Sequence, residues 1–300
     1  MRTRREFLRL AGSAAALLAA PPLAQGAAGE ILTRPVPASG ERLPAVGLGT
    51  SRVFNVGDDP AKRAELAEVL RILVGGGGTI IDTATSYGAA EGVVGDLVAQ
   101  AGLRKQVFIA TKLRAPDAEE LRGSLARLRT DRVDLLFLHN VRDPGQDLGA
   151  FRAWKAEGKC RYMGVTSTSE RDYDAVEAVL KREKPDFIEI DYSLDNREVE
   201  ERLLPLAAEM KAAVLIALPF GRARLFRAVR GKALPGWARE FDAASWAQFF
   251  LKFILAHPAV TAAIPGTSNP AHMADNLGAM RGRLPDAAQR RRMVDLIESL

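Results

Sequence analysis

Val107-Phe-Ile-Ala-Thr-Lys112 and Asp134-Leu-Leu-Phe-Leu-His139 are two short apolar runs, each of which leads into a polar side chain. Neither run alternates polar with apolar residues, which is typical of strands that are buried on both faces, as in a parallel sheet. The two runs therefore predict neighbouring strands of an α/β fold, with polar groups at their carboxyl ends.

Runs of the same kind recur along the chain and alternate with helical patterns. The predicted strands are Ala45–Leu48, Thr79–Ile81, Val107–Thr111, Asp134–Leu138, Tyr162–Val165, Phe187–Ile190, Ala213–Leu218 and Val260–Ile264. Amphipathic helical spacing is found at 62–74, 169–180 and 243–256. Eight such alternations without a linker predict one (β/α)8 TIM barrel. A doubly wound sheet is the alternative, but no GxGxxG motif opens a helix here.

Two segments flank the predicted barrel. Residues 31–44 are expected to form a small hairpin before the first strand, and residues 285–299 one amphipathic helix after the last. The run Gly75–Gly78 lacks the Lys-Ser/Thr of a phosphate loop and is interpreted as a helix end and turn.

The first 28 residues differ from the rest. Thr3-Arg4-Arg5-Glu6-Phe7-Leu8 is similar to a twin-arginine export signal, and an uncharged stretch follows. The apolar run Leu10–Ala20 has 11 residues, too few to span ~30 Å of hydrocarbon as a membrane anchor would. We therefore expect residues 1–28 to be a signal peptide and 29–300 the barrel. The expected partner is the twin-arginine machinery, and the expected location is the periplasm after export in the folded state; a cytoplasmic location is the alternative.

The formal charge of +5 suggests an acidic partner such as nucleic acid. Residues 1–26, however, hold four arginines and one glutamate, so the remainder carries only +2. We therefore expect no nucleic-acid partner. The expectations for the remaining partners are no stable membrane insertion and a monomer. The single cysteine, Cys160, excludes an intramolecular disulfide.

Polar residues gather where a barrel places its active site, at the carboxyl ends of the strands. Asp82, Lys112 and His139 each follow an apolar strand, and Tyr87 lies in the loop beyond Asp82. A nearby ammonium would lower the high pKa of a tyrosine, and a carboxylate would hold that ammonium in place. Such a tyrosine can protonate a carbonyl oxygen while a histidine orients the substrate. The set predicts carbonyl reduction with hydride from a cofactor.

Three motifs, Asp82-Thr-Ala-Thr-Ser-Tyr87-Gly with Glu91, Ala110-Thr-Lys112 and Leu136-Phe-Leu-His139, resemble the aldo-keto reductase family. The resemblance runs in order from Pro37 to Asn276. It implies Tyr87 as general acid, tuned by Lys112 and Asp82, with His139 orienting an aldehyde or ketone.

The resemblance also implies a nicotinamide cofactor, NADP with NAD possible. The cofactor-binding residues that it implies are Gly49, Thr50, Thr166, Ser167, Glu189, Pro219, Phe220, Gly221, Pro265, Gly266, Thr267, Ser268, His272 and Asn276. The chain departs from many members at several places: Ser51 replaces a Trp, Thr166-Ser167 a Ser-Asn pair, Glu189 a Gln, Leu218 a Tyr, and Gly266 and His272 basic residues. Asn269-Pro270 predicts a helix start whose free amides would bind a phosphate.

The loops after Lys112 and Asn140 are short, so we expect an open pocket, with Asn140, Phe54 and Trp154 as candidates for its lining. The chain has three histidines, too few for a His-rich metal centre, and no metal site is predicted. A nucleotide-binding regulatory or sensor protein without turnover is the alternative to an NADP(H)-dependent oxidoreductase.

Overall fold

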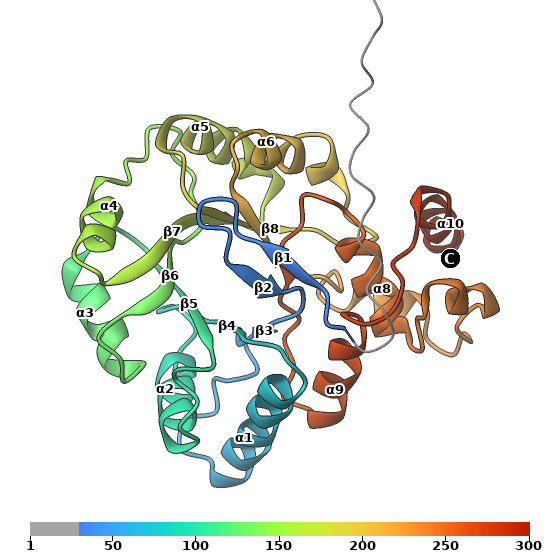
Figure 1. Cartoon of the computed structure of the whole chain (residues 1–300), viewed down its shortest axis with the longest axis horizontal. Coiled ribbons are helices and arrows are strands. Elements are labelled where there is room, and N and C mark those ends of the chain that lie inside the picture. The colour runs from blue at the N-terminus through green and yellow to red at the C-terminus, as the bar shows by residue number, and fades with distance from the viewer. Residues whose placement is uncertain (1–29) are drawn as a thin grey trace, which may run out of the picture.

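The computed structural model describes residues 30–300, which form a parallel barrel inside a ring of helices (Figure 1). The eight barrel strands are β3 (Leu48–Gly49), β4 (Ile80–Asp82), β5 (Phe108–Leu113), β6 (Val133–Leu138), β7 (Cys160–Ser167), β8 (Phe187–Asp191), β9 (Ala213–Ala217) and β10 (Ala262–Ala263). They neighbour one another in chain order and all pair in parallel. The predicted (β/α)8 fold is confirmed. The predicted signal peptide, 1–28, lies outside the described residues.

Helices connect successive strands and cover the outside of the barrel. Their bounds are α1 (Pro60–Gly75), α2 (Ala90–Gln100), α3 (Ala118–Arg127), α4 (Gly149–Ala156), α5 (Tyr173–Glu183), α6 (Leu203–Glu209), α7 (Arg224–Ala228), α8 (Trp246–Leu255), α9 (Pro270–Gly278) and α10 (Ala287–Glu298). Short 3₁₀ helices lie at Glu170–Asp172, Glu198–Glu200 and Gly236–Phe241. Within residues 30–300, no helix is both long and apolar enough to cross a bilayer.

The barrel closes where its first and last strands meet. Val46 bridges Ala263 and Gly49 bridges Gly266, both in parallel. A Cβ on Gly49 would lie 2.7 Å from the carbonyl oxygen of Ile264. Only glycine therefore permits this approach of the two backbones.

Side chains alternate between the inside and the outside of the barrel. The inward-facing core includes Phe108 and Ala110 of β5, Leu135 and Phe137 of β6, and Phe187 of β8. The same alternation places a layer of polar side chains inside the barrel, at the carboxyl ends of the strands and next to the apolar core. These side chains are Asp82, Lys112, His139, Thr166 and Glu189.

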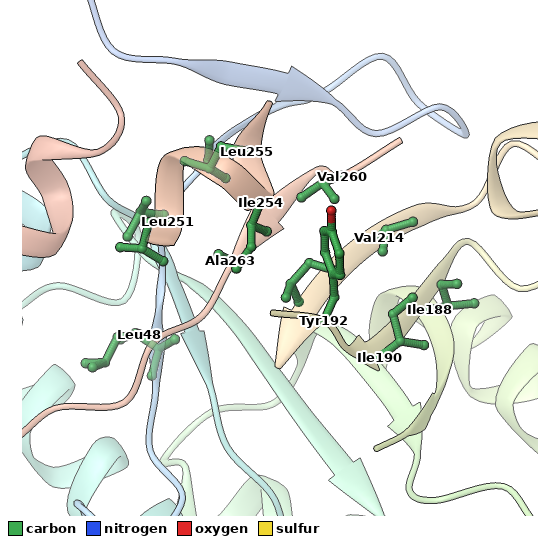
Figure 2. Packing of buried hydrophobic residues seen from close by; sticks show 14 of the residues in the cluster. Leu48, Ile188, Ile190, Tyr192, Val214, Leu251, Ile254, Leu255, Val260 and Ala263 are labelled. Atoms are coloured by element: carbon green, nitrogen blue, oxygen red, sulfur yellow. The ribbon is translucent and has the colours of Figure 1, made fainter. Parts of the chain in front are cut away.

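Outward-facing strand residues pack against the helices. Figure 2 shows Ile188 and Ile190 of β8 and Val214 of β9 close to Tyr192 and to Ile254 of α8. All five are fully buried. Each buried aliphatic side chain of this size contributes about 1.5–3 kcal/mol, so this layer holds the helices on the sheet.

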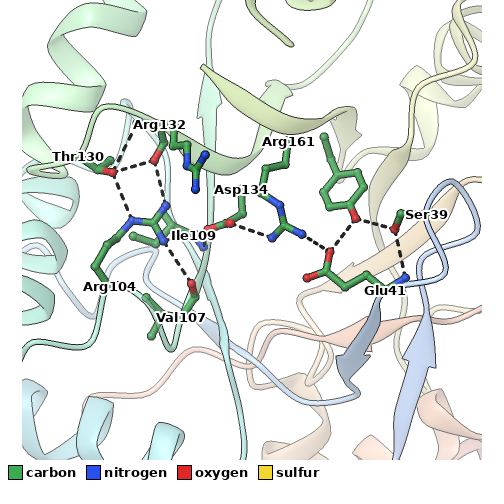
Figure 3. Close-up of polar contacts among 10 residues, drawn as sticks. Ser39, Glu41, Arg104, Val107, Ile109, Thr130, Arg132, Asp134 and Arg161 are labelled. Atoms are coloured by element: carbon green, nitrogen blue, oxygen red, sulfur yellow. Dashed lines mark hydrogen bonds and ion pairs between the residues drawn. The ribbon is translucent and has the colours of Figure 1, made fainter. Parts of the chain in front are cut away.

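The predicted hairpin is present as β1 (Thr33–Pro35) and β2 (Arg42–Pro44), which pair antiparallel. Val36 and Leu43 belong to the core cluster inside the barrel, so the hairpin closes the end opposite the polar layer. Polar contacts fasten it (Figure 3): Arg161 and the Tyr162 hydroxyl both donate to Glu41, at 2.5 and 2.6 Å.

Predicted and observed boundaries differ most at short elements. The first strand was predicted at Ala45–Leu48 but is Leu48–Gly49, since only that stretch pairs continuously with β4. The helix predicted at 169–180 begins at Tyr173, because residues 170–172 form a 3₁₀ turn. The final helix, predicted at 285–299, is Ala287–Glu298, capped by Asp286 and Gln289.

Candidate active site

A pocket of about 570 Å³ opens at the carboxyl ends of the barrel strands. Its lining comes from loops and strand ends on most sides of the barrel. The lining residues are Gly49, Ser51, Arg52, Asp82, Tyr87, His139, Asn140, Thr166, Thr168, Glu189, Ala217, Leu218, Pro219, Phe220, Arg222, Ala223, Phe226, Ile264 and Gly266. Tyr87, Asp82 and His139, predicted from the sequence as catalytic, share this one pocket, and Lys112 lies buried directly beneath it.

Lys112 is the centre of a buried charged cluster. Its ammonium donates to both carboxylate oxygens of Asp82 and, at 3.2 Å, to the carbonyl of Thr83. It also lies 3.1 Å from Oε2 of Glu189. The pairing was predicted for Asp82 but not for Glu189, whose inward position on β8 follows from strand alternation.

The cluster holds two carboxyl groups and one ammonium out of contact with water. Burial lowers the pKa of Lys112, but Asp82 and Glu189 outweigh it, and the net pKa lies above the ordinary value. Burial raises the pKa of Glu189 to about 8, and the neighbouring Asp82 adds to the rise. Lys112 is thus a permanent cation at neutral pH. Burial raises the pKa of Asp82 as well, so the two carboxyls, which share one ammonium, titrate as a coupled pair.

Tyr87 is placed by a tight turn after β4. Its amide donates to the carbonyl of Ala84 at 3.1 Å, and Gly88 follows with a φ of +63°. The Asn55 side chain accepts from the amide of Ala89 at 2.9 Å and fixes the far end of the turn. The ring of Tyr87 stands with its centroid 5.6 Å from the Lys112 ammonium.

The pKa of Tyr87 differs from the expectation. Burial raises it to about 12, and the opposing effect of Lys112 is smaller. Lys112 does act to lower the pKa, as predicted, but the expected net lowering is wrong because burial outweighs the ammonium and the carboxyls of Asp82 and Glu189 add to the rise. Tyr87 is a neutral hydroxyl that can donate a proton at any physiological pH.

His139 stands edge-on to Tyr87, with ring centroids 5.8 Å apart. Burial, aided by Lys112, lowers its pKa to about 4. Nδ1 lies 3.3 Å from the hydroxyl of Ser86. A neutral imidazole beside the tyrosine can share a hydrogen bond with a carbonyl oxygen without adding charge.

Six of the predicted cofactor residues line the pocket: Gly49, Thr166, Glu189, Pro219, Phe220 and Gly266. In this region the buried Oγ1 of Thr50 has no hydrogen-bond partner among the described residues, and the buried Oε2 of Glu189 has an ion pair with Lys112 but no further partner. Because a buried polar atom without a partner is costly, these atoms suit a ligand that supplies one. The residues present therefore fit a bound polar cofactor.

The other predicted cofactor residues lie outside the pocket lining: Thr50, Ser167, Gly221, Pro265, Thr267, Ser268, His272 and Asn276. The Ser167 hydroxyl donates to Asp172 at 3.0 Å. The free amides expected at the start of α9 are partly occupied, since the Asn269 side chain accepts from Ala271 and His272. That cap satisfies the amides locally, so the phosphate role of this helix stays a prediction.

Several pocket residues were missed by the sequence reasoning. Arg52 and Arg222 are exposed at the pocket, and Phe226 completes its apolar side. Arg52 and Arg222 follow the first and seventh barrel strands, so reading every post-strand loop for charge would have found them. Of the suggested lining residues, Asn140 lines the pocket, whereas Phe54 and Trp154 are buried in the core.

Residues 30–300 contain no group of three or more His, Cys, Asp or Glu side chains arranged to hold a metal ion. A second cavity of about 640 Å³ lies at the opposite end of the barrel, beside Glu41, Arg104 and Asp134. Arg161 forms ion pairs with both Glu41 and Asp134 (Figure 3), and Arg104 donates to Asp134 at 3.2 Å. The candidate chemistry therefore belongs to the pocket with Tyr87.

Comparisons with known proteins agree with this geometry. The family model described as "Aldo/keto reductase family" matches residues 45–293. Methylglyoxal reductase YeaE of Escherichia coli (strain K12) is 30% identical over 256 residues, 82% of this chain and 88% of that protein.

Solved structures give the same picture. An aldo-keto reductase from Klebsiella pneumoniae, in complex with NADPH, is 27% identical with a TM-score of 0.72, over 86% of this chain and 92% of its own. The holo form of an aldo-keto reductase from Bacillus halodurans is 25% identical with a TM-score of 0.70, over 89% and 96%. The barrel, the pocket and these matches together show that the chain belongs to the aldo-keto reductase family.

Proposed function

We propose that the protein is an NADP(H)-dependent oxidoreductase that reduces the carbonyl group of aldehydes or ketones. The observation that carries the proposal is the placement of Tyr87, whose ring lies 5.6 Å from a Lys112 ammonium paired with Asp82. The family match and the NADPH complex of the Klebsiella relative support the cofactor.

The cofactor would lie along the wall formed by Gly49, Thr166, Glu189 and Gly266. The unpartnered Thr50 hydroxyl and the Glu189 carboxyl beside Lys112 would lie near its polar groups. When bound, the reduced nicotinamide supplies the hydride for the carbonyl carbon.

The chain's own residues handle the proton. Tyr87 donates its hydroxyl proton to the carbonyl oxygen as negative charge develops there. Lys112, held by Asp82, stabilises the phenolate that remains. The neutral His139 donates a hydrogen bond to the same oxygen and fixes the orientation of the substrate.

We infer small aldehydes, including dicarbonyl compounds, as the substrate class. The relative from Escherichia coli is named a methylglyoxal reductase, and the pocket of about 570 Å³ is open to solvent beside two exposed arginines, Arg52 and Arg222. A panel of aldehydes, ketones and dicarbonyls assayed for NADPH oxidation tests this function. Turnover of a small aldehyde supports it. Tight NADPH binding with no turnover of any member would favour the sensor alternative.

We also propose export through the twin-arginine route, with residues 1–28 as the signal and a monomeric barrel delivered to the periplasm. The Arg4-Arg5 pair followed by Phe7-Leu8 supports the route. Fractionation of cells that express the full chain, beside an Arg4→Lys/Arg5→Lys variant, tests it. Periplasmic protein that disappears in the variant is expected; equal distribution of the two would contradict export.

A further inference from the structure

Glu189 has no role in the proton transfer to the carbonyl oxygen described above. It lies on β8, its side chain is 4% exposed, and it lines the pocket. Oε2 lies 3.1 Å from the Lys112 ammonium, with which it forms an ion pair. A buried carboxyl that is ion-paired with Lys112 therefore lies at the pocket wall, beside any ligand that enters.

The charges around Glu189 do not balance. Asp82 of β4 and Glu189 of β8 share the single ammonium of Lys112 from β5. The other titratable groups that line this pocket are Tyr87, His139 and the exposed Arg52 and Arg222. Tyr87 is neutral, and so is His139, because burial lowers its pKa to about 4. The inner cluster thus carries one negative charge when both carboxyls ionise and none when one of them keeps a proton.

We propose that Glu189 discriminates between the oxidation states of the cofactor, the carboxylate favouring NADP⁺ and the protonated acid favouring NADPH. This inference rests on the proposed function. Hydride must leave the nicotinamide close to the carbonyl that Tyr87 protonates, and Glu189 lines that same pocket. The oxidised ring is a cation, the reduced ring is neutral, and opposite charges attract strongly where water is excluded.

The direction of the pH dependence follows from linkage. Burial raises the pKa of Glu189 to about 8. A cation bound beside it lowers that pKa, so NADP⁺ binding releases a proton and tightens as pH rises. NADPH binding brings no cation and so does not release this proton or tighten with pH. The ratio of the two dissociation constants, NADP⁺ over NADPH, therefore falls with pH, by up to about tenfold for each unit by which the bound cation lowers the pKa.

The experiment measures both dissociation constants by fluorescence titration between about pH 6 and pH 9.5. The two nucleotides carry the same phosphates, so the titration of those phosphates cancels in the ratio. For the wild type we expect the ratio to fall at least fivefold. For Glu189→Gln, which keeps the shape without the charge, we expect a flat ratio. Glu189→Asp is expected to restore part of the fall.

A second measurement uses the wild type alone, so it does not depend on the folding of a variant. Calorimetry near pH 8 in two buffers of different ionisation enthalpy counts the protons released on binding. More protons are expected for NADP⁺ than for NADPH. Equal release, a wild-type ratio that does not change with pH, or a fall that persists in Glu189→Gln would overturn the role of Glu189. Failure to bind either nucleotide would instead overturn the proposed function itself.

Discussion

Lys112 and its two carboxyl partners determine what each group at the site can do. The position of Asp82, Lys112 and His139 after apolar strands was enough to predict that they meet at one end of the barrel. It was not enough to predict the pKa of Tyr87, which depends on the sum of burial and three nearby charges. The residue types and their strand positions are readable from sequence, whereas the balance among them depends on distances that only the fold supplies.

The raised pKa of Glu189 predicts how the free energy of unfolding depends on pH. Its pKa is raised from 4.5 to about 8, so between these values the folded protein holds a proton that the unfolded chain has lost. The stabilisation that this bound proton gives the folded state is fully present below pH 4.5 and is lost as pH rises through about 8. The free energy of unfolding should therefore decline with pH in this window, by up to about 1.4 kcal/mol per unit for one proton.

Urea unfolding of the protein without nucleotide, from pH 5 to pH 8, measures this decline. Glu189→Gln should make it shallower, while Glu119→Gln, an exposed residue on α3, should leave it unchanged. Equal slopes in wild type and Glu189→Gln would contradict the burial of an ionisable carboxyl at this position.

At the scale of elements, helix α2 gives a matched pair of glycines. A Cβ on Gly95 would lie 2.2 Å from the carbonyl oxygen of Arg127, where α2 packs against the end of α3. A Cβ on Gly92 would meet nothing within 4 Å. We expect Gly95→Ala to lower the free energy of unfolding by about 1–3 kcal/mol through overpacking. Gly92→Ala should raise it by up to about 1 kcal/mol through helix propensity. Thermal unfolding that ranks the variants in the opposite order would contradict this packing.

Glu91 joins three elements through one buried carboxylate. It accepts from Thr111 on β5 at 2.7 Å, from Ser124 on α3 at 2.5 Å and from Arg127 at 2.8 Å. Glu91→Ala leaves these donors without an acceptor and should cost about 3–5 kcal/mol. Glu119→Ala, which removes an exposed ion pair with Arg122, should cost less than about 1 kcal/mol. Denaturant midpoints of the two variants test the difference, and similar values would refute the structural role of Glu91.

The strands show which boundaries a sequence pattern can predict. The long apolar run at Val107–Thr111 predicts β5 well because every residue in it is buried. The end strands β3 and β10 are only two residues each and close the barrel through Gly49 and Gly266. A strand of two residues is too short to show a clear hydrophobic pattern. The pairing of β3 with β10 also joins residues about two hundred positions apart. The sequence could therefore predict that these strands exist but not where they begin and end.

For the whole molecule, the two ends of the barrel have separate roles. The hairpin closes one end with Val36 and Leu43, and the pocket with Tyr87 opens at the other. Leu43→Ala should lower the free energy of unfolding by about 2–5 kcal/mol by leaving a cavity in the core. Because the pocket lies at the opposite end, the affinity for NADPH at a temperature where the variant is folded should change less than about twofold. Paired unfolding and binding measurements test this separation, and a large loss of affinity would show that the two ends are coupled.

The central claim is that Tyr87 donates the proton in carbonyl reduction, and Tyr87→Phe tests it most directly. The variant keeps the ring and loses only the hydroxyl. Tyr173→Phe is the matched control, since its hydroxyl is buried and has no hydrogen-bond partner. Single-turnover NADPH oxidation with a small aldehyde should slow by about 10²–10⁴-fold in Tyr87→Phe, with NADPH still bound, and should be unchanged in Tyr173→Phe. Undiminished reduction by Tyr87→Phe would contradict the account.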